Sequence, residues 1–138
     1  MSQTTANFIT QLLAAWNTHD ADRAATFYAP DYEGEDVGEA GLQRGQQGAR
    51  QALERYLHAF PDLHFTQEIT VIEDERVALA WTLRGTHRGK LMNVPPTGRP
   101  IEVNGVSLFI LADGKIRRAK IIWDVAGFLR NVGLLPEL

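Results

Sequence analysis

The hydrophobic pattern of this chain changes once, at Pro61, and this change is the strongest constraint on its fold. Before Pro61, apolar residues recur at the three-to-four-residue spacing of helices. After it, they alternate with the period of two that is typical of strands. A chain that places helices first and a run of strands second is predicted to be α+β, with the helices packed on one face of a curved antiparallel sheet.

The helical part divides into three segments. The first is predicted from apolar residues that share one face: Phe8, Ile9, Leu12, Leu13 and Trp16. A second helix is expected from Asp20, its cap, to Pro30, because the residue before a proline is pushed out of helical geometry. Residues 31–48 are rich in glycine and acid and are expected to be mostly irregular. A third helix then places Ala49, Leu53, Tyr56, Leu57 and Phe60 on one face.

Four strands are predicted after Pro61, at residues 63–72, 76–87, 101–111 and 115–123. The dipeptide Asp113-Gly114 predicts a tight hairpin, since both central positions of such a turn need positive φ. A short last helix is expected over residues 125–132, with Gly133 as its left-handed stop. Asp124 directly precedes this helix. We expect it to cap the helix, with a catalytic role as the alternative.

Composition limits the classes of function. With 138 residues, the chain is expected to form a single domain over residues 1–138. A net charge of −3 gives no reason to expect nucleic acid as a partner, and the absence of cysteine excludes disulfides. We find no signal peptide and no membrane-spanning run, so a cytoplasmic location is expected. No histidines pair with a carboxylate at ligand spacing, so we predict no metal, and we expect no cofactor.

Five motifs resemble one family. They are "AWNTHD", "FYAPDY", "GTHRGKLMNVPPTGRP", "ADGKI" and "WDVAGFLRNVGLLP", and they cover most of the chain in this order. Together they resemble the SnoaL-like polyketide cyclase (ester cyclase) family, within the nuclear transport factor 2-like and ketosteroid isomerase superfamily. The resemblance implies a conical α+β barrel, open at one end and closed by helices around an apolar cavity. It also implies a homodimer or a larger homo-oligomer.

The acid of the characterised cyclases is missing from its position. In that family an inward-facing aspartate on the last strand is acid and base, assisted by a histidine two residues before it. Alignment through "DGKI" places these positions at Ile121 and Ala119, and the neighbouring polar positions at Gly105 and Ser107. A serine hydroxyl cannot replace a carboxylate as general base without another base to activate it.

A second acid position comes from the ketosteroid isomerases. Their general base lies in a pattern that "YAPDYEGEDVG" resembles, which places Asp36 on the base position with Glu35 beside it. A carboxylate there would move a proton next to a carbonyl. The alternative is that Glu33, Glu35 and Asp36 form a solvated loop.

Seven residues are candidates for contact with a substrate: Trp16, Tyr32, Tyr56, His87, Ser107, Ile121 and Trp123. The aromatic members have an ordinary role in the core as their alternative. For His87 the alternative is a structural role, with hydrogen bonds to the backbone of the proline-rich loop.

Three functions remain open from the sequence. The first is a cofactor-independent enzyme that isomerises or cyclises a small hydrophobic carbonyl compound, polyketide- or terpenoid-like. The second is a non-catalytic module that binds such a compound in the same cavity. The third is a dimerisation domain whose interior is filled by its own side chains.

Overall fold

The structure is a computed structural model, and it describes residues 2–138. Its helices and strands follow one another as α1 (Ser2–Asn17), α2 (Ala21–Ala25), β1 (Tyr28–Asp36), β2 (Gln43–Arg44), α3 (Gly45–Ala59), β3 (His64–Glu73), β4 (Arg76–Thr86), β5 (Pro100–Ala112), β6 (Lys115–Trp123) and α4 (Val125–Asn131). This is the predicted α+β class. None of the helices in residues 2–138 is long and apolar enough to cross a membrane.

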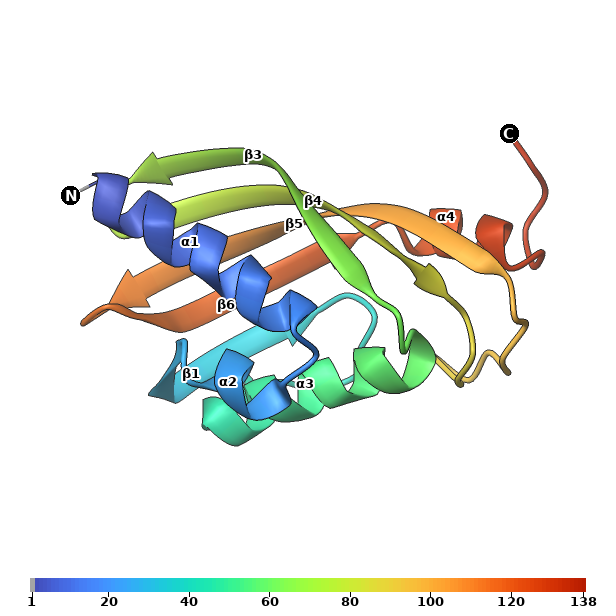
Figure 1. Cartoon of the computed structure of the whole chain (residues 1–138), viewed down its shortest axis with the longest axis horizontal. Coiled ribbons are helices and arrows are strands. Elements are labelled where there is room, and N and C mark those ends of the chain that lie inside the picture. The colour runs from blue at the N-terminus through green and yellow to red at the C-terminus, as the bar shows by residue number, and fades with distance from the viewer. Residues whose placement is uncertain (1) are drawn as a thin grey trace.

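The strands form one curved sheet in the order β2-β1-β6-β5-β4-β3. All neighbours are antiparallel except β1 and β6, which run parallel. The helices α1, α2 and α3 lie on one side of this sheet, where α1 contacts β3 and α3 contacts β1 (Figure 1). The apolar stripes of α1 and α3 meet the inward residues of the strands, and this contact forms the core.

Several local signals in the sequence are confirmed. Asp20 caps α2 by accepting hydrogen bonds from the N–H groups of Asp22 and Arg23. Asp124 caps α4 by accepting one from the N–H of Gly127 at 2.8 Å. The hairpin turn between β5 and β6 has positive φ at Asp113 (52°) and Gly114 (75°). Each of these features is fixed by neighbours in the sequence, so the sequence alone reveals it.

The expectation for the segment between the second and third helices is wrong. The second helix ends at Ala25 and not at Pro30, and residues 28–36, expected to be partly helical and partly irregular, form strand β1. A register shift between Tyr28 and Glu33 interrupts its pairing with β6. This irregularity accommodates Pro30, which has no N–H for a ladder, and it hides the alternation that would otherwise mark a strand.

Candidate active site

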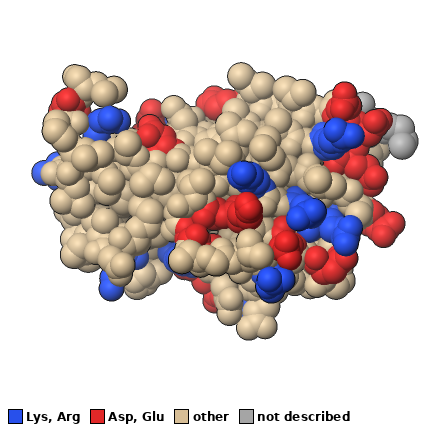
Figure 2. Space-filling view, turned by 180° about the vertical axis from the view of Figure 1, so that it is seen from behind, with Lys and Arg blue, Asp and Glu red and all other residues tan. Residues whose placement is uncertain are grey.

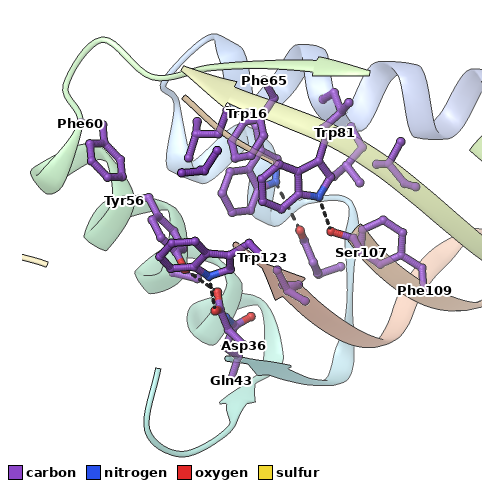
Figure 3. A pocket seen from close by; sticks show the side chains of 18 residues that line it. Trp16, Asp36, Gln43, Tyr56, Phe60, Phe65, Trp81, Ser107, Phe109 and Trp123 are labelled. Atoms are coloured by element: carbon purple, nitrogen blue, oxygen red, sulfur yellow. Dashed lines mark hydrogen bonds between the residues drawn. The ribbon is translucent and has the colours of Figure 1, made fainter. Parts of the chain in front are cut away.

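The inner face of the sheet and the helices α1 and α3 enclose a cavity that is almost entirely apolar (Figure 3). Leucine, valine and aromatic side chains form most of its walls, and the polar exceptions include Asp36, Gln43 and Ser107. Its volume is about 50 Å³, well below the roughly 300–1,000 Å³ of typical ligand sites. A ligand of more than a few heavy atoms must therefore displace side chains from the walls.

Asp36 is the acid of this cavity, and its side chain is fully buried. The Tyr56 hydroxyl donates a hydrogen bond to its Oδ2 at 2.6 Å. The Trp123 indole N–H and the Gly38 backbone N–H donate to its Oδ1 at 3.0 and 2.7 Å. These three donors satisfy most of the roughly four acceptor positions of a carboxylate. The buried acid therefore keeps capacity for one further partner.

The sheet places Asp36 beside Ile121, the position to which the sequence resemblance assigns the catalytic aspartate of the cyclases. In the parallel pairing of β1 with β6, Asp36 is the partner of Ile121. In the antiparallel pairing of β6 with β5, Ile121 is in turn the partner of Ser107. The three residues form one row across the inner face of three strands, with the carboxylate at one end, an apolar side chain between, and a hydroxyl at the other end.

Gly38 donates a hydrogen bond at this site, and its lack of a side chain also matters sterically. A Cβ added to Gly38 would lie 2.6 Å from Cζ2 of Trp123. The indole ring therefore occupies the space that any other residue at position 38 would fill. This close approach allows the backbone N–H of Gly38 and the indole N–H of Trp123 to donate to the same carboxylate oxygen.

Tyr56 is held in its protonated form. Burial raises the pKa of its hydroxyl above the ordinary value, and the nearby Asp36 charge and the hydrogen bond to Asp36 act in the same direction. Tyr56 therefore remains a hydrogen-bond donor to Asp36 throughout the pH range in which proteins are usually studied.

A second acid and an arginine lie behind Asp36. Arg55 Nη2 is 2.9 Å from Oε2 of Glu39 and 3.9 Å from Oδ2 of Asp36. Glu39 Oε2 also accepts a hydrogen bond from Gln43 Nε2 at 3.0 Å. The positive charge of Arg55 thus lies between two carboxylates and offsets part of the cost of burying Asp36.

The structure brings most of the predicted site residues to this cavity. Its walls include the candidate base and five of the candidate substrate contacts: Asp36, Trp16, Tyr56, Ser107, Ile121 and Trp123. Glu35 lies elsewhere, because neighbouring residues of a strand point to opposite faces. It is exposed on the outer face of the sheet, where it is the partner of Lys120.

Tyr32 and His87 are buried but are not part of the cavity wall. The Tyr32 hydroxyl donates to Oε1 of Gln43 at 2.8 Å, so Tyr32 supports a wall residue from behind. His87 packs edge-on against Phe128, and its Nδ1 accepts a hydrogen bond from the Thr97 N–H at 3.3 Å. This is the structural role expected as its alternative, an anchor for the proline-rich loop.

Three wall residues with a hydrogen-bonding side-chain group are not among the site candidates from the sequence: Tyr28, Gln43 and Trp81. Tyr28 falls within the expected second helix, and Gln43 falls within the segment that is expected to be irregular. Trp81 lies in the strand predicted over residues 76–87, and strand alternation shows which side a residue faces but not whether that side is filled. Within residues 2–138, no three histidine or acidic side chains gather in a way that could hold a metal.

Comparisons with known proteins agree with this architecture. The family model of the SnoaL-like polyketide cyclases matches residues 6–132. Nogalonic acid methyl ester cyclase of Streptomyces nogalater is 29% identical over 123 residues, which are 88% of this chain and 92% of that protein. Aklanonic acid methyl ester cyclase DnrD of Streptomyces peucetius is also 29% identical, over 94% of this chain and 91% of its own length.

Solved structures show the same fold. AclR of Streptomyces galilaeus, for which a hydroxylase function has been suggested, superposes with a TM-score of 0.84 at 28% identity, covering 100% of this chain and 89% of that one. TsrD of Streptomyces laurentii superposes with a TM-score of 0.87 at 24% identity, covering 98% of each chain. The family match spans nearly all of the sheet and its helices, and the chain belongs to the SnoaL-like polyketide cyclase family.

Proposed function

We propose that this protein is a cofactor-independent enzyme of the cyclase or isomerase type, with Asp36 as its general base. Its substrate is a small hydrophobic carbonyl compound, polyketide- or terpenoid-like, bound in the apolar cavity. The membership of the chain in a family of polyketide cyclases and its similarity to two ester cyclases support this class of reaction.

One observation carries the assignment of the base. Asp36 is a fully buried carboxylate in the wall of an apolar cavity, and it has capacity for one more partner after its three hydrogen bonds. Removal of a proton next to a carbonyl needs a fixed base in a site that excludes water. Asp36 is in such a place, whereas Glu35 lies on the far side of the sheet.

The reaction balances without a cofactor. Asp36 takes a proton from a carbon next to the substrate carbonyl, and the electron pair of the broken C–H bond forms an enolate. In a cyclase, the enolate carbon attacks a second carbonyl of the same molecule, and the resulting alkoxide takes a proton. In an isomerase, the proton returns to a different carbon of the same conjugated system. Asp36 ends each cycle unprotonated.

A binding protein without catalysis is the second candidate, and a specific observation favours it. The positions that carry acid and imidazole in the characterised cyclases are Ile121 and Ala119 here, and Asp36 is already bonded to three donors. A module that only holds an apolar metabolite would need no free base.

Exchange of α-protons in deuterated water separates the two candidates. Cyclohexanone is incubated with wild type, with Asp36→Asn and with Glu35→Gln, and loss of the α-proton signal is followed by NMR. We expect a rate loss of about 10²- to 10⁴-fold in Asp36→Asn, the range for a general base. Glu35→Gln is the matched control and should exchange like wild type.

Equal exchange by wild type and Asp36→Asn would refute the base assignment. Absence of exchange above the buffer rate in all three proteins would favour the binding module. Tryptophan fluorescence checks that Asp36→Asn is folded, because Trp123 donates to this side chain and reports on its surroundings.

A further inference from the structure

Two hydroxyl groups of the cavity wall share an arrangement that no other side chain of the site has. Ser107 Oγ accepts a hydrogen bond from the indole N–H of Trp81 at 2.9 Å. The Tyr28 hydroxyl accepts one from the indole N–H of Trp16 at 3.3 Å. Neither hydroxyl proton has an acceptor within residues 2–138, although both residues are buried. Each is thus a donor without a partner in the wall of an apolar cavity.

An indole N–H can only donate, so it fixes the direction of each hydroxyl. A hydroxyl whose oxygen faces a donor must turn its own proton elsewhere, and an accepted hydrogen bond strengthens the one it can give. Tyr28 also keeps its proton, because burial raises the pKa of its hydroxyl above the ordinary value. Both groups are suited to bind an acceptor such as a carbonyl or enolate oxygen.

The two tryptophans are held by a common support. Both rings pack edge-on against Phe65, with centroid distances of 5.5 Å for Trp16 and 5.1 Å for Trp81. Gly105 makes room for Trp81, since a Cβ there would lie 2.3 Å from two atoms of its ring. Figure 3 shows the Trp81–Ser107 bond on the opposite side of the cavity from the bonds to Asp36.

The sheet fixes the separation of Ser107 from Asp36. The two residues lie on either side of Ile121 in one row, on strands that are both neighbours of β6. Neighbouring strands are about 4.8 Å apart, so two spacings separate the backbones by about 10 Å. A ligand that lies over Ile121 can therefore contact the carboxylate at one end and a hydroxyl at the other.

We propose that Ser107 and Tyr28 form a carbonyl-binding site, with Trp81 and Trp16 as the residues that position their hydroxyls. The ligand is a ketone whose oxygen accepts from these hydroxyls while its α-carbon is turned toward Asp36. Ligand binding here does not depend on catalysis, but the role of the site in stabilising an enolate rests on the proposed function.

Infrared spectroscopy of a bound ketone tests the site directly. Cyclohexanone labelled with ¹³C at the carbonyl is bound to the full chain, and its C=O stretch is found by difference against unlabelled ketone. A ketone oxygen accepts but cannot donate, so Asp36 cannot account for a shift. We expect a lower stretching frequency in wild type than in hexane, and a return toward the hexane value in Ser107→Ala and Tyr28→Phe.

The positioning role of Trp81 predicts a separate effect on the C=O frequency. Trp81→Phe leaves the Ser107 hydroxyl in place but removes its donor, so the frequency shift should be smaller than in wild type. Ser107→Thr, which keeps a hydroxyl, should restore most of the shift. Thr82→Val is the matched control, because it removes a buried hydroxyl on the outer face of the sheet and should leave the shift unchanged.

Affinity gives a second readout. Methylenecyclohexane has the shape of cyclohexanone without the acceptor oxygen. The preference for the ketone is the ratio of the dissociation constants of the two ligands. This ratio should fall by about twofold to tenfold in Ser107→Ala and in Tyr28→Phe, which corresponds to the loss of one neutral hydrogen bond.

An unchanged frequency in both variants, or no saturable binding of the ketone by wild type, would overturn the proposal. The outcome is independent of α-proton exchange. Exchange that depends on Asp36 together with an unchanged C=O frequency would refute this site alone. A lowered frequency without any exchange would refute the proposed enzyme and leave this site intact.

Discussion

Asp36 receives its three hydrogen bonds from three separate parts of the chain: α3 through Tyr56, the end of β6 through Trp123, and its own following turn through Gly38. A buried carboxylate is costly unless it is paired and hydrogen-bonded. Each of these donors therefore contributes to the stability of the whole fold, and the removal of one leaves the charge less compensated.

This dependence predicts unequal effects for two tyrosines of the same region. Tyr56→Phe removes a donor to a charged group and should lower the free energy of unfolding by about 1.5–3 kcal/mol. Tyr32→Phe removes a neutral bond to Gln43 and should cost about 0.5–1.5 kcal/mol. Urea denaturation of both variants gives the comparison. An equal or larger loss in Tyr32→Phe would contradict this view of Asp36.

At the scale of elements, the loop between β4 and β5 depends on His87. The backbone N–H of His87 donates to the Arg99 carbonyl at 2.9 Å, and its carbonyl accepts from Gly98. Its ring accepts a hydrogen bond from the Thr97 N–H and packs against the rings of Phe60 and Phe128. The loop therefore closes on a buried imidazole. Burial lowers the pKa of His87, because the charged form loses its hydration.

His87 should therefore make stability depend on pH. The unfolded chain takes up a proton on this imidazole as the pH falls through about 6.5, while the folded protein resists it. The free energy of unfolding is thus fully maintained above this value. It decreases as the pH falls further, by at most about 1.4 kcal/mol per pH unit, until the lowered pKa of the folded state is reached.

Urea denaturation between pH 7.5 and 5.0 measures this slope. His87→Gln should be less stable than wild type at pH 7.5 but should lack the component of the slope below pH 6.5. His64→Gln, at an exposed position of β3, is the control and should keep the wild-type slope. If the slope is the same in all three proteins, His87 is not its source.

The same elements show what a sequence can and cannot reveal. The α+β class, the helix α3, the caps Asp20 and Asp124 and the turn at Asp113 follow from patterns within a few residues. Strand β1 did not, because its register shift breaks the alternation. Asp36 was found as an acid only through resemblance. Its donors come from positions far apart in the chain, and no local pattern records such contacts.

At the scale of the whole molecule, the outer face of the sheet carries an apolar band. Its exposed members lie on β3, β5 and β6: Ile69, Val71, Val106, Leu108, Ile110 and Ile122. Figure 2 shows the molecule from behind, with charged side chains gathered toward one side of the view and a broad area without charge beside them. Contiguous apolar surface of this kind is typical of interfaces, so we expect this face to bind a partner.

Charges of both signs border the band at one end, where Arg76 lies beside Glu73 and Lys120 beside Glu35. A closed two-fold dimer would cover the same apolar face on both copies. We propose a homodimer through this face, in line with the assembly that the family resemblance implies.

Leu108→Lys places a charge in the middle of the band and should convert the dimer to a monomer, as measured by light scattering after size-exclusion chromatography. Leu135→Lys changes an exposed leucine that follows α4, outside the band, and should leave the dimer intact. A monomeric wild type, or a Leu108→Lys variant that remains dimeric, would contradict this interface.

The parallel pairing of β1 with β6 also has a consequence for how the protein is made. Asp36 and its partner Trp123 are 87 positions apart, so their contact must wait until all of the intervening chain has been synthesised. Contacts between such distant segments slow folding, because a long loop must close before they form. On the ribosome, the helices and the β3–β4 hairpin can form early, whereas Asp36 stays hydrated until Trp123 emerges. The acid is buried last, together with the partners that compensate it.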